Sequence, residues 1–511
     1  MLAETFDYII VGAGSAGCVV ASRLARDRNH KVCVLEAGPM DRNPYIHIPA
    51  GFIKTVHDPR INWLYQTEPG EWTGGRRISQ PRGKVVGGSG AINGHVFNRG
   101  QACDFDGWLE RGNTGWGYTD VLPYFKRLET YHGTGNSVFR GSNGPFQVTE
   151  LNWQHPLTDA FIQSARELGI PANTDYNGAN QAGVFPAQRS IYRGRRCSPA
   201  QAYLHPALRT GKIDLRQNAL ATKILFDNGR AKELCYRRGG RQYKVEATRE
   251  IILCGGVFNT PQLLQLSGVG SSETLNDLAI PVVHHLPGVG QNLRDHANIR
   301  VPIEVNDDFP LNPNDPRSQV ALRYTATGSE LRNDIQIMAS SFSSPISGDP
   351  LEAEGIRFTC ILELAYGSGH LTITSTDPNV QPQLNYNYFQ DPRDLSRMRE
   401  AVRKCVGFLE HPDYTDIVKN ILEPLPSDLE SDDALDDWLK RSVTTSQHIS
   451  GTCKMGPDSD PMTVVDQQGN VKGLKNLKVV DASIMPDCIR ANTNCTTMMI
   501  AERMAEWIKQ A

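Results

Sequence analysis

Three glycines near the N-terminus and one acid downstream have the types and spacing that bind a dinucleotide. Gly12, Gly14 and Gly17 lie in the run GAGSAG, and Glu36 follows about 20 residues after the last of them. The first glycine of such a run allows a tight turn, the second lets the backbone approach a pyrophosphate, and the third lets helix and strand pack closely. The acid can accept hydrogen bonds from ribose hydroxyls, which favours a cofactor with a free 2′-hydroxyl, NAD or FAD, over NADP.

The elements that must position these residues lie on either side of the glycines. Residues 8–11 and 31–35 are two apolar runs of strand length. Between them, Ala16, Val20 and Leu24 recur at helical spacing on one face. This order predicts a strand, a turn, a helix and a strand, with the positive helix N-terminus at the phosphates. The alternative is a glycine-rich turn that binds nothing.

A second glycine-rich stretch covers residues 81–100. Its glycines permit close backbone approach to a ligand, and Arg82 and Lys84 beside them could balance phosphate charge. When the stretch is taken alone, the alternative is a flexible loop. The glycines in question are Gly83, Gly87, Gly88 and Gly90.

The composition is that of an enzyme with more than one domain. A chain of 511 residues, 39% apolar and 21% charged, is too long for one hydrophobic core. A net charge of −3 offers no basic surface for nucleic acid, and no apolar run is long enough to span a bilayer. The first predicted strand begins almost at once, which leaves no room for a signal peptide. Eleven cysteines without a CxxC pair predict no metal site and a reduced, cytoplasmic setting.

Five motifs resemble those of the glucose–methanol–choline (GMC) flavin oxidoreductases. Residues 83–93 are similar to the first family signature and residues 256–270 to the second. PGVGQNLRDH at 287–296, SQHISGTCKMG at 446–456 and VVDASIMP at 479–486 are further similar runs. They follow the family's order and cover nearly the whole chain. Within the family, the chain most resembles sorbose- or choline-dehydrogenase-like and hydroxymethylfurfural-oxidase-like members.

The resemblance implies an α/β fold with a Rossmann-like FAD-binding domain and an interleaved substrate-binding domain. The FAD-binding domain is expected at 1–150, 201–297 and 443–511, and the substrate-binding domain at 151–200 and 298–442. The second domain is expected to have an antiparallel sheet flanked by helices.

Alternating or mixed apolar runs in the second domain are typical of an antiparallel sheet. Examples are residues 299–303, 335–338 and 371–374. We expect these strands to form one wall of the active site.

The resemblance also assigns chemistry to His448 and Asn492. A base with a pKa near the working pH must take the alcohol proton while hydride leaves carbon for flavin N5, and histidine suits this task. Asparagine cannot act as a base, but its amide can hold the alkoxide oxygen. The helix after Asn494 is expected to point its positive N-terminus at the flavin pyrimidine ring.

One FAD is expected, and the resemblance indicates where the chain would hold it. Ile92 occupies the position at which some relatives carry a histidine joined to the flavin, so we expect non-covalent binding. Asp481 is expected beside the ribityl-phosphate region, with capping of the next turn as the alternative. The expected FAD contacts are Gly12, Gly14, Ser15, Ala16, Gly17, Glu36, Ala37, Arg82, Gly83, Val85, Gly88, Ser89, Asn93, Gly94, Val96, Ala221, Asp481, Ala482, Asn492 and Thr493.

The function that these observations favour is FAD-dependent oxidation of a primary or secondary alcohol to the carbonyl, with O2 or another acceptor reoxidising the flavin. A lyase or a fatty acid photodecarboxylase on the same fold is an alternative, although the photodecarboxylase branch lacks a histidine at the position of His448. A non-catalytic FAD-binding protein is a third alternative. The sequence contains no obvious cage for choline's cation and identifies neither the alcohol nor the oligomeric state.

Overall fold

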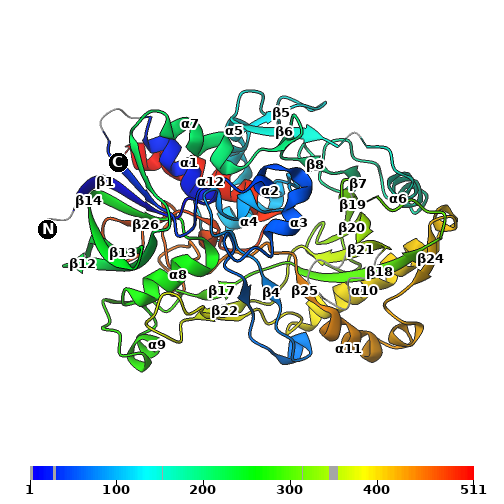
Figure 1. Cartoon of the computed structure of the whole chain (residues 1–511). Coiled ribbons are helices and arrows are strands. Elements are labelled where there is room, and N and C mark those ends of the chain that lie inside the picture. The colour runs from blue at the N-terminus through cyan, green and yellow to red at the C-terminus, as the bar shows by residue number, and fades with distance from the viewer. Residues whose placement is uncertain (1–3, 27–29, 152, 313–314, 344–354, 511) are drawn as a thin grey trace.

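A computed structural model of the chain describes residues 4–26, 30–151, 153–312, 315–343 and 355–510. Two large sheets organise it, one at the left of Figure 1 with α1 and α12 (Ser15–Leu24 and Thr493–Gln510) and one at the right. None of the helices within the described ranges is long and apolar enough to cross a membrane. The two sheets with their flanking helices give the chain the predicted α/β architecture.

The first sheet is parallel at its centre. In spatial order its strands are β11 (Ile213–Arg216), β2 (Val32–Leu35), β1 (Glu4–Val11), β14 (Arg241–Leu253), β13 (Arg230–Arg238) and β12 (Leu220–Asp227), with β26 (Leu477–Val479) paired to β14. The carboxyl ends of β1, β2 and β14 lie side by side, because these strands pair in parallel. Ligands of open α/β sheets bind at this edge.

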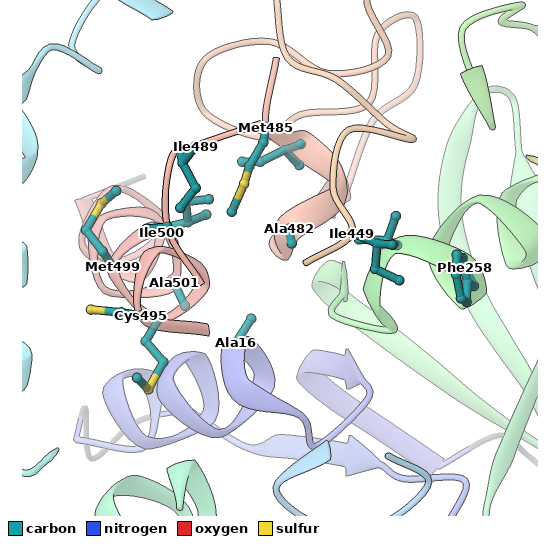
Figure 2. Packing of buried hydrophobic residues seen from close by; sticks show 14 of the residues in the cluster. Ala16, Phe258, Ile449, Ala482, Met485, Ile489, Cys495, Met499, Ile500 and Ala501 are labelled. Atoms are coloured by element: carbon teal, nitrogen blue, oxygen red, sulfur yellow. The ribbon is translucent and has the colours of Figure 1, made fainter. Parts of the chain in front are cut away.

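Helix α1 follows β1 directly, as the glycine pattern predicts. Its residues from Ala16 to Leu24 are all buried, because the sheet covers one side of the helix and α12 packs on another. Figure 2 shows α12 beside the N-terminal part of α1, where Ala16 is labelled, and Met499 and Ile500 are among the buried residues of α12. A helix that is buried all round needs this apolar character on every face.

The second sheet is antiparallel, as predicted. In spatial order its strands are β24 (Val418–Ile421), β18 (Ala297–Val305), β21 (Gly355–Leu362), β20 (Ile335–Ser343), β19 (Ser318–Tyr324) and β7 (Gly183–Pro186), with β25 (Thr444–Thr445) paired to β18. The prediction for residues 371–374 was wrong in one respect. The strand there, β22 (Gly369–Thr372), belongs to a separate three-stranded sheet with β17 (Gln291–Leu293) and β23 (Gln383–Asn385). Alternation identifies a half-buried strand, but it does not select the strand's partner.

Helices flank both sheets, and some of them begin at local capping signals. The side chain of Asp391 accepts a hydrogen bond from the first turn of α10, and Ser431 does the same for α11. The larger helices are α4 (Ala102–Glu110), α5 (Tyr118–Leu128), α6 (Pro156–Glu167), α8 (Gly256–Leu266), α10 (Pro392–Leu409) and α11 (Asp432–Ser442).

We propose that the chain divides into the two interleaved domains with the boundaries given above. Strand β7, from the expected substrate segment 151–200, supports this division because it joins the second sheet by pairing with β19. The β17–β22 ladder crosses the division, because β17 precedes residue 298 and β22 follows it.

A buried acid ties α12 to its neighbours. Glu502 has a side-chain exposure of 0%, and its carboxylate accepts hydrogen bonds from Arg23 of α1, Arg127 of α5 and the Tyr203 hydroxyl. Removing one member of a buried ion pair leaves an uncompensated charge, which costs far more than loss of an exposed pair.

We therefore expect Glu502→Ala to lower the free energy of unfolding by about 3 kcal/mol or more, because Arg23 loses its partner. The control is Glu506→Ala on the same helix, since Glu506 is 40% exposed and also pairs with Arg127. That change should cost less than about 1 kcal/mol. Equilibrium urea unfolding measures both variants, and equal losses would contradict the assignment.

Candidate functional site

A large cavity lies where the first sheet meets residues 81–96, 446–449 and 481–497. The centres of water-sized molecules can occupy about 290 Å³ of it. Of the predicted site residues, all but Gly17 and Val85 line this cavity. Those that do are Gly12, Gly14, Ser15, Ala16, Glu36, Ala37, Arg82, Gly83, Gly88, Ser89, Asn93, Gly94, Val96, Ala221, His448, Asp481, Ala482, Asn492 and Thr493.

The two predicted residues that do not line the cavity are buried close to it. A side chain at Gly17 would run into the carbonyl oxygen of Gly12, so the helix can pack on the turn only with glycine there. Val85 belongs to a small apolar cluster that includes Ile92, a cavity-lining residue.

The two glycine-rich segments meet backbone to backbone at the cavity. A Cβ on Gly88 would come within 2.6 Å of Gly14 Cα. Gly12 has a φ of +98°, and a Cβ there would lie 2.5 Å from the carbonyl oxygen of Cys254. Gly14 leads into α1 without a side-chain cap, which leaves first-turn N–H groups for a ligand. This backbone cradle fits the pyrophosphate of a dinucleotide.

Glu36 lies at the carboxyl end of β2 and is 6% exposed. Its two carboxylate oxygens accept hydrogen bonds from the backbone N–H groups of Ala13 (2.9 Å) and Gly38 (2.8 Å). Burial raises the pKa of Glu36 to about 7, although these N–H groups oppose the rise. Each oxygen keeps a further lone pair, which could accept from ribose hydroxyls.

Two arginines brace the second glycine segment. Arg82 donates to the carbonyl oxygens of Pro81 (2.6 Å) and Gln447 (3.1 Å), which ties it to the residue before His448. Arg196 donates from Nη1 to Asn93 Oδ1 at 2.7 Å. Burial lowers the pKa of Arg82, and it lowers the pKa of Arg196 to about 9.

Asp481 caps two helix N-termini. Its Oδ1 accepts from the N–H of Ser483, and its Oδ2 accepts from the N–H of Gly256 (2.8 Å) and the Thr260 hydroxyl (2.7 Å). The capping that the sequence left as an alternative is thus present. Because Asp481 also lines the cavity, we propose that it contacts the cofactor as well.

His448 and Asn492 meet at the cavity wall. Asn492 Nδ2 lies 2.8 Å from His448 Nε2, and the other ring nitrogen, Nδ1, lies 2.9 Å from His296 Nδ1. The backbone N–H of His448 donates to Asp295 Oδ1 at 2.8 Å. Burial, followed by the charges of His296, Arg82 and Arg323, lowers the pKa of His448 well below its ordinary value.

The hydrogen-bond partners assign the tautomer of His448. His296 Nε2 lies 2.8 Å from the carbonyl oxygen of Ile489, which can only accept, so this nitrogen carries a proton. In neutral His296 the Nδ1 lone pair is therefore free to accept from His448 Nδ1–H. With His296 neutral, His448 Nε2 then holds the lone pair of the ring and accepts from Asn492 Nδ2. In that state the basic nitrogen of His448 is the one at the cavity, whereas a charged His296 would donate to His448 Nδ1 and leave the His448 proton on Nε2.

Asp295, His296 and Glu363 are residues of this site to which the sequence assigned no role. Asp295 also accepts from the hydroxyls of Tyr388 and Thr445, both at 2.5 Å, and so anchors the His448 backbone. The first two belong to the motif at 287–296, which was a usable signal. For Glu363 the signal was one acid within the apolar run at 360–364, since unpaired acids are rarely buried.

The sequence predicts no metal site. Among the described residues, Glu167, His411 and Asp413 bring possible ligand atoms within 4.8 Å of one another, away from the cavity. His411 lies 3.2 Å from each of the two carboxylates, and Glu167 is exposed.

Comparison with known proteins identifies a family. Two models described as GMC oxidoreductase match residues 6–298 and 365–501. Choline dehydrogenase, mitochondrial, of Mus musculus is 37% identical over 99% of this chain and 90% of its own length. The oxygen-dependent choline dehydrogenase of Photobacterium profundum is 34% identical over 99% of this chain and 93% of its own.

Solved structures have the same fold over their whole length. Pyridoxine 4-oxidase from Mesorbium loti superposes with a TM-score of 0.91 at 28% identity, covering 99% of both chains. Formate oxidase from Aspergillus oryzae has a TM-score of 0.91 at 23% identity, covering 99% of this chain and 98% of its own.

The environment of Glu36 generates a prediction about cofactor affinity. If ribose hydroxyls donate to the ionised carboxylate, FAD should bind most tightly above pH 7 and more weakly as the pH falls through about 7. Glu36→Gln should weaken binding about tenfold, since a hydrogen bond to a charged group is lost, and should abolish this pH dependence. Fluorescence titration of the apoprotein with FAD measures both effects. Glu71→Gln, at an exposed acid, is the control, and wild-type affinity in Glu36→Gln would refute the assignment.

Proposed function

The chain belongs to the GMC oxidoreductase family and is an FAD-dependent alcohol oxidoreductase, and we propose that His448 is its catalytic base and Asn492 its oxyanion-holding residue. The observation that carries the proposal is the pairing of the two side chains at the cavity wall, where His448 Nε2 lies 2.8 Å from the Asn492 amide nitrogen. The names of the relatives include both dehydrogenases and oxidases. We propose that O2 or another acceptor completes the cycle.

In this mechanism the substrate hydroxyl inserts between His448 Nε2 and Asn492 Nδ2. The proton of the hydroxyl moves to Nε2, and the Asn492 amide donates to the oxygen as negative charge develops on it. FAD, when bound, supplies the acceptor for the hydride that leaves the carbinol carbon. Asp295 fixes the His448 backbone, and Asn98 Nδ2 donates to Asn492 Oδ1 at 3.4 Å, so both side chains are held for the reaction.

We propose that this chain holds FAD non-covalently. Ile92, which lines the cavity, offers no nucleophile to the flavin. Denaturation of the yellow protein should leave all the flavin in solution, and a yellow precipitate would contradict the proposal. We also propose a cytoplasmic location, supported by eleven cysteines that are all free thiols. Cell fractionation tests it.

Two relatives are choline dehydrogenases by name, but the charges at this cavity argue against a cationic substrate. Among the described cavity-lining residues the only acids are Glu36 and Asp481, and both carboxylates already accept backbone hydrogen bonds. Two cavity-lining aromatic rings are already engaged: Trp63 stacks on Tyr65, with the Lys84 ammonium 4.6 Å from the Trp63 ring, and Phe258 packs edge to face with Tyr65. The site therefore offers neither a free carboxylate nor a free aromatic cage to a quaternary ammonium group.

Positive charge near the base adds to this argument. Arg82 lines the cavity, and Arg323 is 1% exposed with no ion pair to any residue in the described part of the chain. Both contribute to the lowered pKa of His448, so their charges are felt at the base. Arg323 donates from Nε and Nη2 to Gln336 Oε1, a neutral acceptor. We propose that the substrate is a neutral or anionic alcohol.

The proposed roles of His448 and Asn492 can be separated. His448→Ala should slow anaerobic flavin reduction at least about a hundredfold with FAD retained, because the positioned base is lost. Asn492→Ala should also slow reduction, but the fall in kcat/KM at low pH should persist because the base remains. In His448→Ala that fall should vanish or move. Stopped-flow reduction across pH measures this, and wild-type behaviour of His448→Ala would make the histidine structural.

Choline and 3,3-dimethylbutan-1-ol have the same shape, with a quaternary carbon in place of nitrogen. Because a cation meets the uncompensated charges of Arg82 and Arg323, we expect kcat/KM for the neutral alcohol to exceed that for choline at least about tenfold. Arg323→Met should narrow this ratio by removing one charge. Preference for choline by the wild-type enzyme would overturn the proposed substrate class. If neither alcohol reduces the flavin, the same kcat/KM ratio is measured with an aryl alcohol and its counterpart that carries a quaternary ammonium group.

A further inference from the structure

A buried acid stands behind the two histidines. Glu363 is 2% exposed, and its Oε2 lies 3.5 Å from His296 Nδ1. That same Nδ1 lies 2.9 Å from the Nδ1 of His448. His448 at the cavity wall and the buried Glu363 therefore both lie close to one ring nitrogen of His296.

The position of Glu363 is set by the second sheet. Its backbone N–H donates to the carbonyl oxygen of Asp334 at 2.8 Å and so continues the ladder between β20 and β21. His296 comes directly before β18, which is the other neighbour of β21. Pairing of β18 with β21 brings the acid and the imidazole together on rigid elements, and this fixes the distance between them.

Burial of this carboxylate calls for a partner. Glu363 Oε2 has no hydrogen-bond partner among the described residues, and the described ion pairs of Glu363 contain His296 alone. An isolated carboxylate is costly to bury, and a nearby cation offsets that cost. His296 can supply the cation, but only when it carries a second proton.

We propose that Glu363 is a positioning residue for the reaction, one that stabilises the positive charge which alcohol deprotonation places on the His448–His296 pair. This inference rests on the proposed role of His448 as the base. It assigns a role in catalysis to an acid that touches neither the substrate nor the cofactor and acts through two rings.

The proton transfers balance without another reactant. The alcohol O–H bond breaks and its proton forms a bond to His448 Nε2. The proton on His448 Nδ1 passes along the 2.9 Å contact to His296 Nδ1, while His296 Nε2 keeps the proton that it donates to the Ile489 carbonyl. The alcohol has then lost one proton, and the histidine pair has gained one. The charge ends on His296, beside Glu363.

The surrounding groups favour this direction of transfer. Burial disfavours charge on His296, but Cys488, whose Sγ lies 3.0 Å from Nε2, and Glu363 outweigh it, with Asp295 adding to them, and together they raise the pKa of His296 to about 10. The Cys488 contribution belongs to its thiolate, because a neutral thiol does not attract a cation. The transfer starts from neutral His296 and so with Cys488 as a thiol, and Glu363 is then the acid beside the incoming charge. The pKa of His448 is lowered by burial, by His296 and by two arginines, the cavity-lining Arg82 and the buried Arg323. A proton shared by the pair is therefore more stable on His296.

Removal of the carboxylate charge with little change in shape tests the proposal. In Glu363→Gln the protonated pair loses its counter-ion, so the fall of kcat/KM at low pH should move at least about one unit further down. The pair also becomes a weaker base, and anaerobic flavin reduction should slow about tenfold. Glu363→Asp, which keeps the charge, should restore much of the pH profile of kcat/KM and much of the flavin-reduction rate. Glu250→Gln, at another largely buried acid on β14 whose partner is Lys478, should change neither.

A second measurement does not depend on turnover or on the variant folding well. In ¹⁵N-histidine NMR of the wild-type holoprotein, His296 should take up its second proton at a higher pH than His448 does. Titration of both rings at their ordinary pKa, or of His448 first, would overturn the proposal, as would an unchanged pH profile in a folded Glu363→Gln enzyme. If instead His448→Ala keeps wild-type reduction, the proposed base itself is wrong, which is a different result.

Discussion

Backbone packed against backbone at the nucleotide cavity is the constraint on which the rest of the structure depends. The turn at Gly12 lies on the Cys254 carbonyl, and Gly88 lies on Gly14, with no room for a Cβ at either contact. Such contacts supply little side-chain packing of their own, so other elements must hold the three segments in place. The pairing of β1 with β14 holds two of them, and Asp481 fixes the turn into α8 by capping it. The positions of the cavity residues on these segments follow from this arrangement.

The two residues of the proposed chemistry are held in place by different contacts. Asn492 precedes α12 by one residue, and the Ser15 hydroxyl at the start of α1 donates to Asn494 Oδ1 at 2.6 Å. This hydrogen bond fixes the position of the Asn492 amide relative to the glycine turn. His448 is held instead against the second sheet. Asp295 accepts hydrogen bonds from the His448 backbone N–H and from the hydroxyls of Tyr388 and Thr445. The base is held by the second sheet and the amide by the start of α12 beside the first sheet. The two side chains therefore meet only when both parts of the fold are correctly packed.

Much of this could be predicted from the sequence, because its signals are local along the chain. The first strand, turn, helix and second strand follow from glycine spacing and apolar period, and the family motifs indicated the alcohol oxidoreductase that the comparisons show. What was missed depends on strand pairing. Glu363 meets His296 only because β21 lies beside β18, and β22 left the expected sheet because it pairs with β17. Alternation predicts the faces of a strand but not its neighbour, so these contacts had no local signature.

A base inside a closed cavity faces opposing electrostatic requirements. Removal from water keeps His448 neutral and its Nε2 lone pair free, which the reaction needs at its start. The same burial, with Arg82 and Arg323 nearby, opposes the positive charge that the reaction creates. On our proposal, the second ring resolves this conflict by moving that charge inward to His296 and Glu363. The two arginines lower the pKa of His448, whereas the groups around His296 raise its pKa, so the transfer moves the new cation to the ring that lies beside an acid. A histidine made a weak base by its cavity can thereby remain an effective one.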